Sequence, residues 1–144
     1  MEADFRDPTL EGNEKIKEVI HLFHQDQTEE LYTAACLAIR ERMAQNGHFL
    51  FPADITEDAD GQTTFCFKTM DVNAHPLLVA FTDQEEFRKA PPSGAVSQFI
   101  DSMLENLLQQ DGIAGLIINP WGERFLLGKE DIAMILMPGS ERFI

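Results

Sequence analysis

The sequence predicts a single-domain α/β protein, more narrowly α+β, in which helices pack on a mixed sheet of about five short strands. Two observations lead to this fold class. Apolar residues in the first third recur with the period of a helix, whereas after residue 47 they occur in short alternating or fully apolar runs between turn residues. The 144 residues, 44% hydrophobic and 25% charged, suit one core. We expect one domain over residues 13–144, after a flexible arm over residues 1–12.

The first third is expected to be an N-terminal helical pair over residues 13–46. Asn13 is placed to cap the first helix, and Asp26 and Glu29 have capping-box spacing at the start of the second. The apolar stripe of the first helix consists of Ile16, Val19, Ile20 and Phe23.

Residues 48–137 are expected to form the sheet and the helices that cover it. Two runs, 48–55 and 63–69, predict the strands of a hairpin, with Asp60-Gly61 as its turn. Residues 76–81 are apolar at nearly every position, which is typical of a central strand covered on both faces.

Helices and strands alternate in the second half. Thr82 and Glu85 have capping-box spacing before a short helix, and residues 95–110 carry a wide apolar stripe that predicts a longer helix. A strand, a turn, a returning strand and a closing helix are then expected at residues 113–118, 119–122, 124–127 and 129–137.

The formal net charge is -14, from 25 acidic and 11 basic side chains, and 14 of the acids lie within the first 60 residues. A surface this negative repels phosphate backbones and anionic lipids, so we expect neither nucleic acid nor membrane as a partner. It favours basic proteins, cations and solubility.

Cysteine usage and the N-terminus predict the cellular compartment. Cys36 and Cys66 are thirty residues apart and form no CxxC motif. The acidic N-terminus lacks the apolar segment of a secretion signal, and no run approaches the ~18 apolar residues of a membrane span. We therefore expect a protein of the cytoplasm.

Three stretches, taken in their order and spacing, give a family resemblance. They are HFLFPADI, PLLVAFTDQEEF and GLIINPWGERFLL, and their most specific points are Phe81-Thr82 and Asn119-Pro120. Over about residues 48–137 the chain resembles the N-terminal domain family of the bacterial SseB proteins. The resemblance implies a small α/β domain of the bacterial cytoplasm with no established reaction and no motif of catalytic residues. A function that resides in the C-terminal domain of longer members is not implied.

Reactive side chains do not form a recognisable motif. His21 and His24 lie one helical turn apart with Asp26 nearby, but a zinc site needs further ligands that no spacing supplies. Free cysteines usually act as small core hydrophobes, and Cys66 could face either side of its strand. Glycine patterns that hold phosphate are absent from the sequence. We therefore expect no catalytic residue, metal or cofactor.

One alternative is an enzyme whose site is assembled from distant residues such as His48 or His75. Another is a small acidic chaperone-like protein for a secreted partner, which the low isoelectric point and the apolar stripe at 95–110 fit. Proteins of that class are usually dimers, so a homodimer is among the expected states.

Trp121, the only tryptophan, lies in an NPWG turn between two strands. Its side chain either anchors an interface, as exposed aromatic residues often do, or folds back over the sheet edge. We predict a non-catalytic protein-interaction domain that binds a protein partner. Its predicted surface consists of Thr82, Glu85, Asn119, Pro120 and Trp121.

Overall fold

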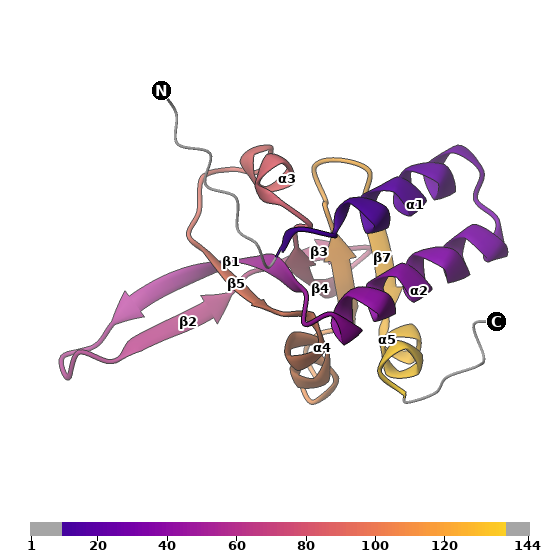
Figure 1. Cartoon of the computed structure of the whole chain (residues 1–144). Coiled ribbons are helices and arrows are strands. Elements are labelled where there is room, and N and C mark those ends of the chain that lie inside the picture. Colours follow the sequence, from indigo (N-terminus) through magenta and orange to yellow (C-terminus); the bar gives the residue numbers. More distant parts are fainter. Residues whose placement is uncertain (1–9, 138–144) are drawn as a thin grey trace, which may run out of the picture.

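The computed structural model describes residues 10–137, which form a mixed α+β domain with an N-terminal helical pair (Figure 1). The fold class predicted from the sequence is confirmed. The elements are α1 (Glu14–Gln25), α2 (Glu29–Ala44), β1 (His48–Glu57), β2 (Thr63–Phe67), β3 (Thr69–Val72), β4 (His75–Ala80), α3 (Gln84–Arg88), β5 (Ala95–Phe99), α4 (Ile100–Leu108), β6 (Gly115–Ile118), β7 (Phe125–Gly128) and α5 (Lys129–Leu136).

The seven strands within residues 10–137 form two sheets, not one sheet of about five strands. One has the order β2-β1-β5 and the other the order β3-β4-β6-β7. Within the second sheet β4 and β6 are parallel, and the other neighbours are antiparallel. Leu50 and Phe81 join the two sheets, because the N–H of each donates to the carbonyl of the other at 2.9 and 2.8 Å.

Two predicted elements have to be corrected. The run 63–69 is split into β2 and β3 at Lys68, whose N–H bonds to Pro52 of β1 and whose carbonyl accepts from Val79 of β4. Residues 95–99, predicted as the start of a helix, form β5 because they pair antiparallel with His48–Pro52 of β1. Pairing with a distant strand outweighs the local helical pattern there.

The helix starts also differ from the predictions. Thr28, not Asp26, caps α2, since its Oγ1 accepts from the Leu31 N–H at 3.1 Å. Asp83, not Thr82, caps α3, since its Oδ1 accepts from the Glu86 N–H at 2.9 Å. Asn13 makes no capping bond, because its side chain is used elsewhere.

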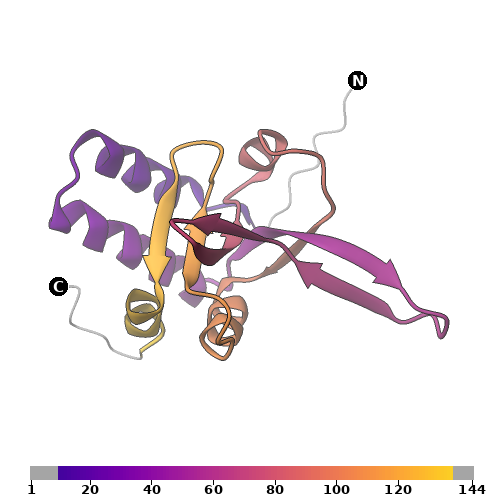
Figure 2. The same ribbon diagram turned by 180° about the vertical axis from the view of Figure 1, so that it is seen from behind.

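The main core lies between one face of the four-stranded sheet and the helices α1, α2, α4 and α5. In Figure 2, α1 and α2 lie behind this sheet and α4 and α5 lie below it. Its large buried side chains include Phe49, Phe51, Leu104, Leu116 and Phe125. A smaller cluster on the other face of the sheet contains Val79, Phe81 and Ile117. It also includes Leu10, which is buried. Residues 10–12 of the predicted arm belong to the described range, and residues 1–9 lie outside it.

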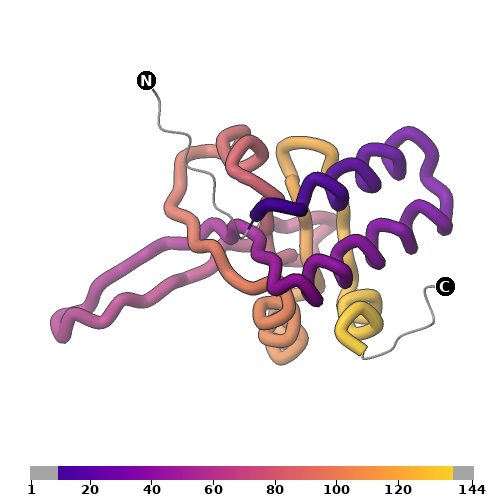
Figure 3. The backbone as a smooth tube through the Cα atoms, viewed as in Figure 1, coloured from indigo at the N-terminus to yellow at the C-terminus, as the bar shows by residue number. Residues whose placement is uncertain are grey.

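Strands β1 and β2 continue beyond the body as a two-stranded projection, here called the β-arm and defined as residues 53–67 (Figure 3). The buried residues of β1 end at Ala53, and Asp54–Glu57 are exposed. This predicted hairpin is confirmed, but only its base contributes to the core.

Within residues 10–137, no helix combines the length and the apolar character that crossing a lipid bilayer requires.

Candidate functional site

Two of the predicted site residues meet where the parallel strands β4 and β6 end. Parallel strands have their carboxyl ends at the same sheet edge, which is the edge where ligands bind in open α/β sheets. Thr82 follows β4 and Asn119 follows β6. The Thr82 N–H donates to Asn119 Oδ1, and Asn119 Nδ2 donates to Thr82 Oγ1, both at 3.0 Å. Asn119 has a φ of 53°, a left-handed conformation that asparagine tolerates better than most residues.

The pair belongs to a larger buried polar network. Asn13 Nδ2 donates to the carbonyls of His48 and Thr82, both at 2.8 Å, and Asn13 Oδ1 accepts from Arg42 Nε at 2.7 Å. Arg42 Nη1 also donates to Gln45 at 2.9 Å. This edge network, defined as Asn13, Arg42, Thr82 and Asn119, ties together both N-terminal helices and the ends of three strands. Among residues 10–137, Glu86 is the only other buried polar side chain.

The guanidinium of Arg42 is packed between backbone segments. Gly47 lies against it so closely that a Cβ there would be 2.7 Å from Arg42 Cζ. Any larger residue at 47 would have to displace the buried cation, which explains the glycine at this position.

Next to the network, three carboxylates surround one ammonium group. Lys17 Nζ lies 3.1 Å from Asp83 and 3.2 Å from both Glu85 and Glu86. Partial burial opposes the charge of Lys17, but hydrogen bonds to Asp83, Glu85 and Glu86 outweigh it, and the pKa of Lys17 is raised. Lys89 binds Glu86 as well, at 2.9 Å.

Carboxylate oxygens of Asp83, Glu85 and Glu86 lie within 4.8 Å of one another, a spacing that suits a metal ion. The Lys17 ammonium lies within 3.2 Å of all three and already supplies the positive charge. The cluster is therefore better described as a salt-bridge network than as a metal centre.

Glu86 has one further feature. Its Oε1 is buried and has no hydrogen-bond partner among the described residues. Glu86 also lines a pocket of about 60 Å³, together with Lys17, Lys89, Asn119 and Glu123. Gly122 passes so close to Oε1 that a side chain there would collide with it. A pocket this small suits ordered water rather than an organic ligand.

Trp121 forms the rim of an apolar groove. Its indole stacks on the buried Phe81 ring, with centroids 6.4 Å apart and planes 24° apart, and the residue stays 44% exposed. The groove, here called the Trp121 groove, has a volume of about 140 Å³. Its walls come from Pro52, Lys68, Thr69, Met70, Val79, Phe81, Phe87, Ala90, Pro91, Pro92, Ser93 and Trp121.

Two histidines hold the loop that carries Trp121 against α1. His21 Nδ1 lies 2.8 Å from Glu123 Oε1, and His24 Nε2 lies 2.6 Å from the carbonyl of Arg124. The two side chains considered as zinc ligands therefore contact this loop.

The five predicted surface residues divide into two groups. Glu85 and Trp121 are exposed and Pro120 is half-buried, whereas Thr82 and Asn119 are buried. The prediction that Thr82 and Asn119 belong to the surface is wrong. Both are buried, and their mutual hydrogen bonds hold the turn that carries Trp121.

Lys17, Arg42 and Glu86 were not predicted as residues of the site, and Asn13 was predicted only as a helix cap. For Arg42 a signal exists in the sequence, since it continues the buried stripe of Ala35, Ala38 and Ile39 on α2. A cation in that stripe indicates a buried polar partner.

The other candidate groups lie apart from this edge. His48 Nδ1 is 2.9 Å from Ser97 Oγ and its ring contacts Phe99, so it links β1 to β5, and His75 is exposed at the start of β4. Cys36 is buried and Cys66 is exposed. Burial, and then the charge of Asp131, raise the pKa of Cys36 to about 12.

Comparisons with known protein families, with curated proteins and with solved structures give no match to this chain.

Proposed function

We propose that this chain is a non-catalytic protein-interaction domain that binds its partner through the Trp121 groove. One observation carries the proposal: the single tryptophan is half exposed on a rim, over a ring that is itself buried. A large aromatic side chain held in place before binding loses little conformational entropy on contact, and tryptophan is enriched among the residues that dominate interface energies.

The size of the groove supports a protein side chain as its occupant. Pockets that hold cofactors or drug-sized ligands usually measure about 300–1,000 Å³. The Trp121 groove, at about 140 Å³, suits one large apolar side chain presented by a partner.

The charge around the groove narrows the partner further. None of its wall residues is acidic, and Lys68 is the only charged one, with Asp54 outside the groove 3.6 Å from its ammonium. A segment with an apolar residue next to a neutral or acidic one therefore fits this groove better than a basic segment does.

The edge network gives the groove a rigid base. Thr82 directly follows Phe81, and Asn119 fixes the turn that leads into Trp121. A surface that is ordered before binding loses little conformational entropy on contact, so this arrangement supports recognition of a partner.

The proposal includes the bacterial cytoplasm as the site of action and kinship with the SseB N-terminal domains. Two free cysteines, Cys36 and Cys66, are compatible with a reducing compartment. The kinship rests on the three sequence stretches that carry the resemblance.

The test is affinity capture from bacterial cytoplasm with the full-length chain, followed by quantitative mass spectrometry. Wild type is expected to retain a stoichiometric protein that Trp121→Ala loses. Leu22→Ala, which truncates an apolar residue of similar exposure on α1, is the control and should retain it. Equal capture by wild type and Trp121→Ala would sink the proposal.

Trp121 is also a direct probe, because no other tryptophan contributes to the fluorescence of this chain. Addition of the purified partner is expected to shift its emission to shorter wavelength as the exposed part of the indole is covered. An unchanged spectrum at saturating partner would contradict contact at this groove.

A further inference from the structure

We propose that the chain has a second binding surface, on the β-arm, where a basic and extended segment of a partner protein adds as a further strand to the free edge of β2. This surface is distinct from the Trp121 groove. Its partner segment is basic, whereas the Trp121 groove suits a neutral or acidic segment.

The first step concerns the backbone of β2. The Ala53 N–H points toward β5, where it bonds to the Gly94 carbonyl, whereas the Pro52 carbonyl accepts from Lys68 on the side of β2. Backbone groups alternate in direction along an antiparallel pair. The N–H and C=O groups of Phe65 and Phe67 therefore face away from β1.

Nothing within residues 10–137 pairs with this edge, since β2 has β1 as its single neighbour in the sheet. An edge with unpaired N–H and C=O groups is a template for another strand, and strand addition is a recurrent mode of peptide recognition.

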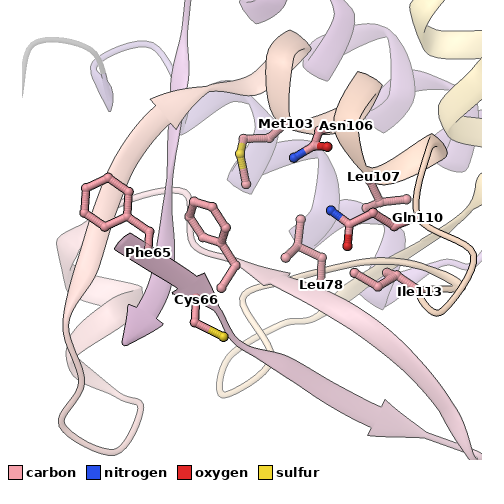
Figure 4. Close-up of a pocket in the computed structure, with 9 residues that line it drawn as sticks. Phe65, Cys66, Leu78, Met103, Asn106, Leu107, Gln110 and Ile113 are labelled. Atoms are coloured by element: carbon pink, nitrogen blue, oxygen red, sulfur yellow. The ribbon is translucent and has the colours of Figure 1, made fainter. Parts of the chain in front are cut away.

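Beside the edge lies a groove of about 260 Å³, the β-arm groove, which Figure 4 shows. Phe65 and Phe67 line it on one side, and Met103, Asn106, Leu107 and Gln110, on and just after α4, line it on the other. Side chains of a strand alternate in direction, so an added strand would place every second side chain in this groove.

The apolar face of the β-arm extends beyond the body. Ile55 and Phe65 are directly opposite in the strand register, and they are 50% and 42% exposed. An isolated two-stranded hairpin is only marginally stable in water, so a third strand over this face would also stabilise the β-arm.

Asn106 and Gln110 add polar recognition. Asn106 lies on α4 and Gln110 just after it, and both are exposed residues that line the groove. No hydrogen bond of either side-chain amide is found within residues 10–137. A primary amide both donates and accepts, so it suits the backbone of an extended segment.

Charge decides between the possible occupants. The β-arm contains Asp54, Glu57, Asp58 and Asp60, and α4 contains Asp101 and Glu105, but neither stretch contains Lys or Arg. Lys68, just after the β-arm, lies 3.6 Å from Asp54, so the acidic character of this surface comes from the other carboxylates. A second copy would bring a second set of carboxylates to the same edge, and like charges repel. A segment rich in Lys or Arg, with apolar residues at alternate positions, complements both the charge and the groove.

The experiment selects linear peptides from a random display library on the full-length chain at physiological salt. Each selected clone is then measured by fluorescence anisotropy against wild type, Phe65→Ala, Phe65→Pro and Trp121→Ala. We expect a class of clones with net positive charge and alternating apolar residues, whose affinity Trp121→Ala leaves unchanged.

For that class, Phe65→Ala removes the ring but keeps the outward N–H, whereas Phe65→Pro removes both. A further loss of about tenfold from Ala to Pro is expected for one hydrogen bond to the partner. A copy of the peptide with N-methyl groups on its bonding face tests the same hydrogen bonds on wild type, whether or not Phe65→Pro folds.

Several results would overturn the inference. These are the absence of any basic, alternating class among the selected peptides, and full binding by the N-methylated copy. A wild-type dimer in sedimentation that Phe65→Pro dissociates would show that a second copy covers the edge. If every clone is lost on Trp121→Ala and none on Phe65→Pro, the Trp121 groove stands and this second surface does not.

Discussion

The carboxyl edge of β4 and β6 and the β-arm differ in where the chain places its polar groups. At the sheet edge, the side chains of Asn13, Arg42, Thr82 and Asn119 are buried and bonded to one another. In the β-arm the order is reversed, with Ile55 and Phe65 exposed among carboxylates.

The two regions show two ways in which a structure departs from the rule of apolar inside and polar outside. Burying polar groups costs free energy unless every one is bonded, and the benefit is a unique geometry. Exposing apolar groups to water costs hydrophobic free energy, and exposed apolar patches often mark an interaction site. The comparison suggests that the edge network gives rigidity and the β-arm gives contact.

Thiol reactivity gives the largest expected contrast, because Cys66 is exposed on the β-arm whereas Cys36 is buried in the main core. A rise of the Cys36 pKa from 9.0 to about 12 lowers its thiolate fraction at pH 8 about a thousandfold. In native protein a thiol reagent should therefore react rapidly with the exposed Cys66 and hardly with Cys36. Unfolding in urea should make the second thiol, that of Cys36, available to the reagent. Ellman's reagent, with Cys66→Ser as control, measures both.

The sign of the pH effect follows from the same shift. The neutral Cys36 thiol is favoured in the folded state, so its contribution to stability is present below about pH 9 and is lost as the pH rises toward 12. Rapid modification of both cysteines in native protein at pH 8 would contradict the burial of Cys36.

Removal of one network side chain should have the largest effect on the free energy of unfolding. Asn13→Ala removes the donor to the buried Thr82 carbonyl and the part-buried His48 carbonyl, and the acceptor of the Arg42 Nε–H, which should cost about 3 kcal/mol. Asn106→Ala makes the same chemical change at an exposed amide on α4 and should cost less than about 0.5 kcal/mol. Urea denaturation compares the two, and equal losses would remove the distinction between these regions.

Lys17→Ala tests the carboxylate cluster beside the network. Loss of its charged hydrogen bonds should cost about 1–2 kcal/mol. Magnesium or calcium should then raise the melting temperature of the variant, but not of wild type, because Asp83, Glu85 and Glu86 keep metal-binding spacing. Lys15→Ala breaks a solvent-exposed pair with Glu41 and is the control with little effect.

The pH dependence of this difference can be given a sign. A raised pKa means that Lys17 stabilises the fold fully below its ordinary pKa of 10.5 and progressively less above it. The difference in the free energy of unfolding between wild type and Lys17→Ala should be constant from pH 7 to pH 10 and decrease at higher pH. A gap that widens above pH 10.5 would contradict this account.

The smallest effect is expected at the tip of the β-arm. Gly61 has a φ of +80°, and a Cβ added there would have no atom within 4 Å. Gly61→Ala therefore adds only backbone strain, about 1 kcal/mol. The strain should speed amide hydrogen exchange in β2 while exchange in β4 and β6 stays unchanged. Gly112→Ala, in open space without that φ, is the control.

Local pattern was sufficient to predict the helical pair, the hairpin and the buried strand β4, since each follows from periodicity and turn residues. The sequence also indicated that Thr82 and Asn119 matter, but not that they are buried. Thr82 is bonded to Asn13, 69 residues away in sequence, and a contact between such distant residues leaves no local trace. The strand β5 was missed for a similar reason, because pairing with β1 decides its conformation.

The β-arm lies outside the core, and this has a consequence for how far the molecule can reach. Two residues added to each of β1 and β2 would lengthen the arm by about 7 Å and keep its apolar face on the same side. One residue added to a single strand would instead move the apolar side chains beyond the insertion to the opposite face of the arm from those of the other strand. The length of the β-arm can therefore be changed in steps of two residues per strand, while the hydrophobic core stays unchanged.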